Sequence, residues 1–373
     1  IKELELYLKK DLRTLLTDFN FSLNKGQKVG LIGEEGNGKS TLLKAIYDKN
    51  LISDYVEIKG EINKQKEIIA YLPQQIEEKD KHSTTAEYFE SQLPSLRVDD
   101  SEFYSLLDQL QLNEDRTSTD LLFGDLSGGE KIKLQLLCIL MKRPTILLLD
   151  EPTNDLDIKS VQWLEQFIMN LSIPLMFVSH DETLLENCAN TIIYIEQLMR
   201  KSKAKYTISK MGYTKFVEQR ENRIANQEQV AAKEKEEYKK QMERYRRIYQ
   251  RVDHEQRAIS RQDPHGGQLL KKKMHSVKAM GKRFEKEKES MTKRPDYEES
   301  INVQFNDFPS IPNGRNIVDL HLKKLNAGKK VLSRNIKLQV YGPKKICIIG
   351  DNGCGKTTLL RAIHEHILEK KLA

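Results

Sequence analysis

Residues 33–40 read Gly33-Glu34-Glu35-Gly36-Asn37-Gly38-Lys39-Ser40, which fits the pattern GxxxxGK[ST]. A short apolar run precedes this octapeptide and a helical pattern follows it, so it is expected to join a strand to a helix. Glycines in such a turn let backbone N–H groups converge on phosphate oxygens at the N-terminus of the helix. The sequence therefore predicts a phosphate-binding loop, with Lys39 directed to the outer phosphates and Ser40 to Mg²⁺.

The same pattern occurs a second time in the chain. The second copy is Gly350-Asp351-Asn352-Gly353-Cys354-Gly355-Lys356-Thr357. The flanking segments repeat as well, because residues 15–46 correspond to 331–363 with one residue inserted after the turn at Gly342. A strand–loop–helix unit that is duplicated in this way indicates two homologous domains, each with its own phosphate-binding loop.

The composition is that of a folded and highly charged chain of 373 residues. Apolar residues make up 38% of it, but no run approaches the roughly 20 apolar residues that a membrane helix needs. The N-terminus lacks the pattern of a signal peptide. The four cysteines lie far apart without a CxxC pair, which argues against zinc and iron–sulfur frameworks and fits a reducing compartment. We therefore expect a cytoplasmic location and no membrane partner.

The order of apolar segments predicts an α/β fold for residues 1–205. Continuous apolar runs at 146–149, 174–178 and 191–195 are typical of strands that are buried on both faces of a mostly parallel sheet. Residues 301–373 repeat only the opening of this pattern. We expect them to be the N-terminal part of a second, incomplete domain, so that the chain is a piece of a longer protein.

Residues 206–300 differ in character from the segments on either side. Between 200 and 294 there are 28 Lys and Arg against 13 Asp and Glu, a balance of +15 in a chain whose net charge is +7. A helical pattern from Tyr213 is broken near 263–267, and a second runs from about Leu269 to Met291. The pattern predicts an antiparallel two-helix arm. A basic arm between acidic bodies indicates a polyanionic partner, although a solvated helix face would give the same composition.

Two further motifs accompany the first phosphate-binding loop. Asp150 and Glu151 follow the apolar run at 146–149, where Asp150 would hold Mg²⁺ and Glu151 would polarise an attacking water. A helix cap is the alternative role for this acidic pair. Residues 126–130 read Leu-Ser-Gly-Gly-Glu and open a helix, which makes a second anion site as well as a capping box between Ser127 and Glu130. That site could close over a nucleotide that another domain holds.

Taken in order, these motifs resemble those of an ABC ATPase. The order includes Gln74 after Tyr-Leu-Pro at 71–73, Asp157 at the end of Thr-Asn-Asp-Leu-Asp, and His180 in Ser-His-Asp. The resemblance implies ATP and Mg²⁺ as cofactors. It also implies that Gln74 lies near Mg²⁺ and the attacking water, that Asp157 is the D-loop aspartate, and that His180 is the switch histidine at the γ-phosphate.

The resemblance gives a set of expected site residues. The catalytic residues are Glu151, His180 and Gln74, and the Mg²⁺ site comprises Ser40, Gln74, Asp150 and Thr357. The ATP-binding residues are Gly33, Gly36, Asn37, Gly38, Lys39, Ser40, Thr41, Ser127, Gly128, Gly129, Gly350, Gly353, Cys354, Gly355, Lys356, Thr357 and Thr358. In this family each ATP lies between the P-loop of one domain and the signature motif of the other. The resemblance places the signature at residues 126–130, so Lys356 would face Ser127 to Glu130. Because the second signature is missing, we expect little steady hydrolysis from this chain alone. The adenine-stacking aromatic of the family is not at its usual offset, and Tyr7 is the candidate substitute.

Two ABC domains joined by a basic helical arm, with no membrane span, resemble the ABC-F family. The resemblance implies that the two domains pair within one full-length chain. It further implies that the protein binds the 70S ribosome at the tRNA exit site and that its arm meets tRNA and rRNA near the peptidyl-transferase centre. The role would be in translation or in ribosome protection against antibiotics. Two alternatives fit the arm less well: the ATPase subunit of a transporter whose membrane part is a separate chain, and a DNA-acting ABC ATPase.

The arm carries its cations toward the expected tip near 253–267. The candidate RNA-binding residues are Arg246, Arg247, Arg251, Arg257, Arg261, Lys271, Lys272 and Lys273. Structured RNA is recognised mostly through shape, phosphate and 2′-OH contacts, so many cations with few base-reading groups suit it. Tyr245, Tyr249 and His265 could stack on exposed bases, but such residues more often pack in the seam of a hairpin.

Overall fold

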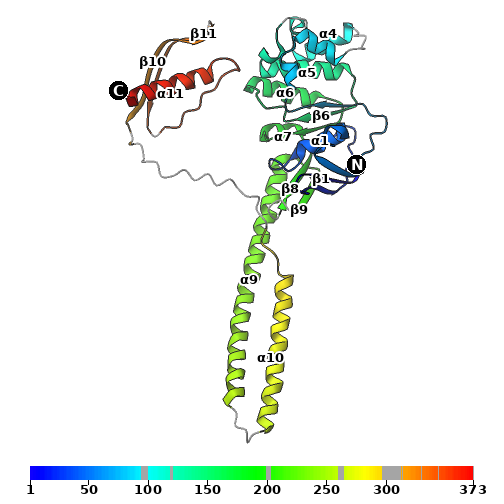
Figure 1. Cartoon of the computed structure of the whole chain (residues 1–373), viewed down its shortest axis with the longest axis vertical. Helices are drawn as coiled ribbons and strands as arrows, with labels where there is room; N and C mark the ends of the chain where they lie inside the picture. Colours follow the sequence, from blue (N-terminus) through cyan, green and yellow to red (C-terminus); the bar gives the residue numbers. More distant parts are fainter. Residues whose placement is uncertain are drawn as a thin grey trace. The chain divides into compact units, whose positions relative to one another are not determined.

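The computed structural model describes residues 1–93, 100–117, 121–198, 203–258, 264–295, 312, 314–328, 330–342 and 344–372 (Figure 1). The chain forms two compact units. One unit comprises Ile1–Tyr213 and Glu298–Ala373, and the other comprises Thr214–Tyr297. Among the helices described, none is long and apolar enough to cross a membrane.

A six-stranded sheet forms the centre of the first unit, in the order β5-β6-β7-β3-β8-β9. Its strands run parallel from β5 to β8, and β9 runs antiparallel to β8 at one edge. They are β3 (Lys28–Ile32), β5 (Ile69–Leu72), β6 (Ile146–Asp150), β7 (Leu175–Val178), β8 (Thr191–Gln197) and β9 (Lys203–Ser209). This mostly parallel sheet, with helices between its strands, confirms the predicted α/β fold.

A smaller antiparallel sheet packs into the same core. It has the order β2-β1-β4, with β1 (Lys2–Leu8) between β2 (Thr14–Phe19) and β4 (Val56–Glu61). One cluster of buried side chains contains Leu4 and Phe19 from this sheet together with Leu148 and Met176 from the central sheet. The shared core therefore holds the turn between β1 and β2 beside the P-loop that follows β3.

Helices connect the strands of the central sheet, and several begin at side-chain caps. The helices are α1 (Lys39–Tyr47), α2 (Glu78–Lys81), α3 (Thr85–Gln92), α4 (Asp100–Leu110), α5 (Gly128–Met141), α6 (Ile158–Asn170) and α7 (Glu182–Cys188). Asp157 and Asp181 accept backbone N–H groups at the starts of α6 and α7. Ser127 and Glu130 form the predicted capping box at α5. Helix α1 differs, because its N-cap residue is Gly38, which makes no side-chain cap.

The second copy of the repeat contains a long hairpin and a helix. These elements are β10 (Asn316–Ala327), β11 (Lys330–Tyr341) and α11 (Lys356–Leu372). The first copy has a short strand, β3, before its P-loop, but residues 344–350 form no strand, and Ile346 and Ile349 are exposed. In the first copy β3 pairs with β7 and β8, and the described part of the second copy includes no counterparts of these two strands.

The second unit is a pair of helices, α9 (Tyr213–Ala258) and α10 (Pro264–Ser290), which lie side by side (Figure 1). Val252 packs with Met274 and Val277 near one end of the pair. Near the other end, the Thr292 N–H donates to Glu234 at 2.6 Å. Contacts between early residues of one helix and late residues of the other are those of an antiparallel hairpin, so the structure contains the predicted two-helix arm.

The start of the second arm helix differs from the sequence prediction. We predicted a start near Leu269, because Gly266 and Gly267 are poor helix formers. Instead α10 begins at Pro264 and includes both glycines. Proline suits the first helical position, where its fixed φ is favourable and its missing N–H costs nothing. The central sheet continues to Ser209 and α9 begins at Tyr213, while the expected domain limits of 1–205, 206–300 and 301–373 stay predictions.

The P-loop backbone gives a test of this fold. Gly33 has φ 149°, and a Cβ added there would lie 2.4 Å from the carbonyl oxygen of Ile195. Gly36 has φ 76°, but an added Cβ would meet nothing within 4 Å. We expect Gly36→Ala to lower the free energy of unfolding by about 1–2 kcal/mol, the usual cost of a left-handed alanine. Gly33→Ala should lower it further, because a backbone atom cannot move aside. Urea unfolding of both variants measures the difference, and equal decreases would contradict this packing.

Candidate nucleotide-binding site

The first P-loop has the geometry of an anion site. The first turn of α1 has no side-chain cap, which leaves its backbone N–H groups for an anionic ligand. Lys39 is nearly buried, and its Nζ donates to the carbonyl oxygens of Gly33 at 2.6 Å and Glu34 at 3.0 Å. Asn37 is also buried and donates from Nδ2 to the carbonyl oxygen of Ile195 at 3.1 Å. Asn37 therefore anchors the loop to β8, and the Lys39 ammonium is hydrogen-bonded to carbonyl groups of the same loop.

The carboxylate of Asp150 connects this loop to two strands. Ser40 Oγ donates to Asp150 Oδ1 at 2.8 Å, and Tyr71 Oη donates to Oδ2 at 2.9 Å. Asp150 is 1% exposed. Burial and the neighbouring Asp150 raise the pKa of the Tyr71 phenol, so Tyr71 remains a donor. Hydroxyl and carboxylate oxygens are ligands that Mg²⁺ prefers, so Ser40 and Asp150 fit a Mg²⁺–nucleotide at this place.

Glu151 and His180 form a pair beside Asp150. His180 Nε2 lies 3.2 Å from Glu151 Oε1, and Glu151 is 7% exposed. Burial raises the pKa of the Glu151 carboxyl, an effect that His180 and Lys39 partly oppose. Glu151 also has a left-handed φ of 49°, an uncommon conformation for a non-glycine residue that often marks functional sites. The two residues come from the ends of neighbouring strands β6 and β7.

These groups line one pocket of about 560 Å³. The predicted residues among its lining are Gly36, Gly38, Lys39, Ser40, Thr41, Gln74, Glu151 and His180. The lining also includes residues that the sequence analysis missed, namely Leu8, Arg13, Leu15, Glu35 and Asn154. Three of these lie near the turn between β1 and β2, which matches none of the sequence motifs. They are recognisable only once the sheet that contains them is packed beside the P-loop.

Tyr7 does not line this pocket, so the suggestion that it replaces the missing aromatic is wrong. Its Oη donates to Glu5 Oε2 at 2.8 Å, and the Lys59 ammonium lies 5.0 Å from its ring centroid. Successive side chains of a strand point to opposite faces. The next residue, Leu8, therefore lines the pocket, while the Tyr7 side chain lies on the opposite face of the sheet with Glu5 and Lys59.

The signature residues lie elsewhere in the first unit. A Cβ on Gly128 would lie 2.2 Å from the carbonyl oxygen of Asp155 and 3.5 Å from Asn352 Nδ2. A Cβ on Gly129 would lie 2.3 Å from Ser160 Oγ. The two glycines thus allow the D-loop (residues 153–157) and the start of α6 to approach α5 closely. Ser127 and the glycines after it do not line the pocket of the first P-loop.

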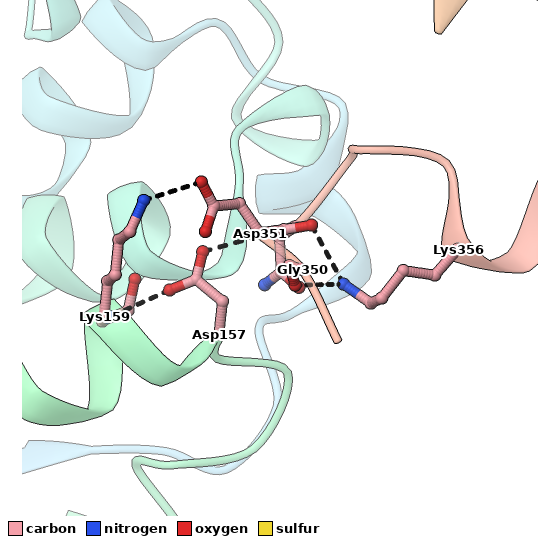
Figure 2. Close-up of polar contacts among 7 residues, drawn as sticks. Asp157, Lys159, Gly350, Asp351 and Lys356 are labelled. Atoms are coloured by element: carbon pink, nitrogen blue, oxygen red, sulfur yellow. Dashed lines mark hydrogen bonds and ion pairs between the residues drawn. The ribbon is translucent and has the colours of Figure 1, made fainter. Parts of the chain in front are cut away.

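The second P-loop contacts the D-loop, as Figure 2 shows. The Asn352 N–H donates to Asp157 Oδ2 at 3.3 Å, and Asn352 Nδ2 donates to the Asp155 carbonyl oxygen at 2.6 Å. Lys159 Nζ lies 2.9 Å from Asp351 Oδ2. The Ser160 N–H is the main cause of the lowered pKa of Asp157, which keeps this carboxylate charged.

The second P-loop repeats the lysine geometry of the first. Lys356 Nζ donates to the carbonyl oxygens of Gly350 at 2.7 Å and Asp351 at 2.9 Å (Figure 2). Gly353 and Gly355 have left-handed φ values of 73° and 100°. Cys354 is exposed, and the predicted residues Thr357 and Thr358 lie in the first turn of α11. Both loops therefore have the same local form, although their surroundings differ.

The arm cations are exposed along α9 and α10. The residues concerned are Arg246, Arg247, Arg251, Arg257, Lys271, Lys272 and Lys273. Arg257 pairs with Asp253 at 2.9 Å, an exposed pair that contributes little to stability. Tyr245 and Tyr249 pack against the Val252 cluster, the alternative that the sequence analysis favoured over base stacking. Arg261 falls outside the described residues.

A known protein family matches the two segments that contain the P-loop motifs. The family model described as "ABC transporter" matches residues 16–154 and 333–371, the two copies of the repeat. Among solved structures, the ATP-binding subunit of an ABC transporter matches 56% of this chain and 89% of that chain at 20% identity, with a TM-score of 0.43. The chain is therefore an ABC-type nucleotide-binding protein on the basis of its motifs, its sheet order and the family match.

Curated relatives narrow the class. "Ribosome protection protein VmlR" of Bacillus subtilis is 30% identical over 94% of this chain and 59% of its own length. "ATP-binding protein Uup" of Buchnera aphidicola is 28% identical over 94% and 53%, and "ABC transporter F family member 2" of Arabidopsis thaliana is 26% identical over 94% and 53%. The chain thus spans little more than half the length of these relatives. These matches support the prediction from the motifs and the arm that the chain is an ABC-F ATPase.

The Asp150 contacts give a test of the site. Tyr71→Phe removes only the hydroxyl and leaves Asp150 Oδ2 buried without this donor. We expect the free energy of unfolding to fall by about 1.5–3 kcal/mol, the usual contribution of a hydrogen bond to a charged group. Tyr47→Phe is the control, because its half-exposed ring stacks on Tyr71 at 5.4 Å and that stacking is kept. Urea unfolding should show a change below about 0.5 kcal/mol for the control. Equal changes in the two variants would show that the Tyr71 hydroxyl is not needed.

Proposed function

We propose that the protein is a Mg²⁺-dependent ATPase of the ABC-F type that binds the ribosome. The observation that carries this proposal is the presence, in one chain, of a pocket lined by P-loop, Gln74, Glu151 and His180 and of a basic two-helix arm. We further propose that the arm reaches from the tRNA exit site toward the peptidyl-transferase centre. The role would be in translation or in protection of the ribosome against antibiotics.

The pocket residues have separate tasks in this proposal. The N–H groups of the P-loop and Lys39 hold the phosphates, which requires Lys39 to exchange its bonds with the Gly33 and Glu34 carbonyl oxygens for phosphate oxygens. Ser40 and Asp150 hold Mg²⁺, which when bound supplies positive charge to the phosphate oxygens. Gln74 and His180 orient groups at the terminal phosphate. Glu151 accepts a hydrogen bond from the attacking water, and burial makes its carboxylate a better base.

The second P-loop supports pairing of the two copies. Asn352 lies within reach of both Gly128 and the D-loop carbonyl of Asp155. A nucleotide held by Lys356 would then meet the signature helix α5, whose first turn contains Gly128 and Gly129 and presents backbone N–H groups. In this arrangement closure of the two copies depends on the nucleotide, because its phosphates join both elements.

The arm supports a ribosomal rather than a membrane partner. Residues 200–294 have a net charge of +15, and the arm cations named above are exposed to solvent. Such a surface attracts the phosphates of nucleic acid and does so without reading sequence. One relative carries the name of a ribosome protection protein, which agrees with this partner.

Ribosome co-sedimentation tests the proposal. In the full-length protein, Glu151→Gln with the equivalent second-domain change should keep ATP binding while slowing hydrolysis, so that more protein pellets with 70S ribosomes in ATP than without nucleotide. Replacing Lys271, Lys272 and Lys273 by alanine should weaken pelleting. The same replacement should reduce the slope of log affinity against log salt by about 1 for each phosphate that a lysine no longer neutralises.

The control is a triple alanine variant of Lys2, Lys49 and Lys66, which are exposed in the first unit. This variant loses the same amount of charge as the arm variant. It should pellet like the unmodified protein. Failure to pellet at low salt, with ATP binding demonstrated, would contradict the ribosomal role. Preferential binding to duplex DNA or recovery with membranes would favour the two alternative functions instead.

A further inference from the structure

The turn between β1 and β2 places two side chains at the nucleotide pocket. The Leu8 N–H donates to the Arg13 carbonyl oxygen at 2.8 Å and closes the turn, while the Arg13 N–H donates to Asp11 Oδ1 at 3.1 Å. Leu12, at the exposed tip, has a left-handed φ of 56°. The turn is thus held by its own hydrogen bonds, which fix the backbone from which Leu8 and Arg13 extend.

The Arg13 guanidinium lies against the P-loop with part of its hydrogen-bonding capacity unused. Its Nη2 donates to the Gly36 carbonyl oxygen at 2.9 Å. Its Nε is buried and has no hydrogen-bond partner in the part of the chain that the structure describes. Buried donors are nearly always paired in native proteins, so a small shift that turns this Nε–H toward the pocket would let a ligand supply the missing acceptor.

Leu8, Arg13 and Leu15 are the pocket residues from the three-stranded sheet and its turn. In the proposed function the P-loop binds the phosphates of the nucleotide, and Glu151 and His180 lie at the terminal phosphate. The sheet residues therefore remain for the nucleoside. In the described residues no Phe, Tyr or Trp side chain lines this pocket, and Tyr7 is turned toward Lys59.

We propose that Leu8 and Arg13 form the subsite for the nucleoside half of the nucleotide, in place of an aromatic ring. This inference rests on the nucleotide-binding function proposed above. Leu8 offers an apolar contact to the base, and the planar Arg13 guanidinium offers its face to the base and its Nε–H to the ribose. An aliphatic and a guanidinium surface discriminate weakly between bases, so affinity comes mainly from the triphosphate.

Isothermal titration with MgATP, MgGTP and magnesium tripolyphosphate tests this assignment. We expect the unmodified protein to bind ATP and GTP within about threefold of each other. Arg13→Ala should weaken both nucleotides roughly tenfold and leave tripolyphosphate within about twofold, whereas Arg13→Lys should recover part of the affinity. Leu8→Tyr adds a stacking ring and should strengthen ATP binding roughly tenfold, a gain that a misfolded variant could not show.

The outcomes separate this inference from the function on which it rests. If tripolyphosphate binds but neither Arg13→Ala nor Leu8→Tyr alters ATP affinity, the assignment of this subsite is wrong. If Arg13→Ala weakens tripolyphosphate as much as ATP, Arg13 is a phosphate ligand and the assignment to the nucleoside fails. A preference above tenfold for one purine would also overturn it. If neither nucleotide nor tripolyphosphate binds to any form, the proposed ATPase function itself fails.

Discussion

The burial of one carboxylate at the end of a parallel strand is the constraint on which the site depends. Asp150 is enclosed where β6 ends, and it accepts hydrogen bonds from Ser40 on α1 and Tyr71 on β5. A charge in such a place is tolerated only when it is paired with donors or cations. The two donors therefore fix the P-loop helix and strand β5 relative to β6. Glu151, the next residue, is then placed beside His180 at the end of β7.

Much of this arrangement follows from local sequence. The P-loop pattern, the apolar run before Asp150 and the cap at Ser127 each describe a few neighbouring residues, so their structure is set by local rules of turns, strands and caps. The carboxyl ends of parallel strands meet at one edge of a sheet, which brings the motifs together. By contrast, Arg13 reaches Gly36 across 23 residues through a turn with no recognisable motif. No periodicity in the sequence could have predicted that contact.

The differences from the sequence predictions have physical causes of the same kind. Tyr7 and Leu8 are adjacent, and which one lines the pocket is decided by the register of β1 against β2 and β4. The apolar residues at 344–350 resemble those of β3, but a parallel strand needs neighbours, and β3 has β7 and β8. Helix α10 starts early because Pro264 can begin a helix that glycines alone would not favour. In each case tertiary pairing or one residue outweighs local propensity.

The two P-loops show how the same local motif acquires different electrostatic surroundings. Lys39 lies near the buried Glu151, whose pKa it lowers against the effect of burial. Lys356 has the same bonds to its own loop, but the nearby partners are the D-loop carboxylate of Asp157 and the ion pair between Lys159 and Asp351. The first loop therefore shares its pocket with a carboxylate suited to activate water. The second is held against a helix start whose glycines bring backbone groups close together. The two loops share the pattern GxxxxGK[ST] but differ in their neighbours, so these neighbours rather than the pattern determine which protein groups a bound phosphate would meet.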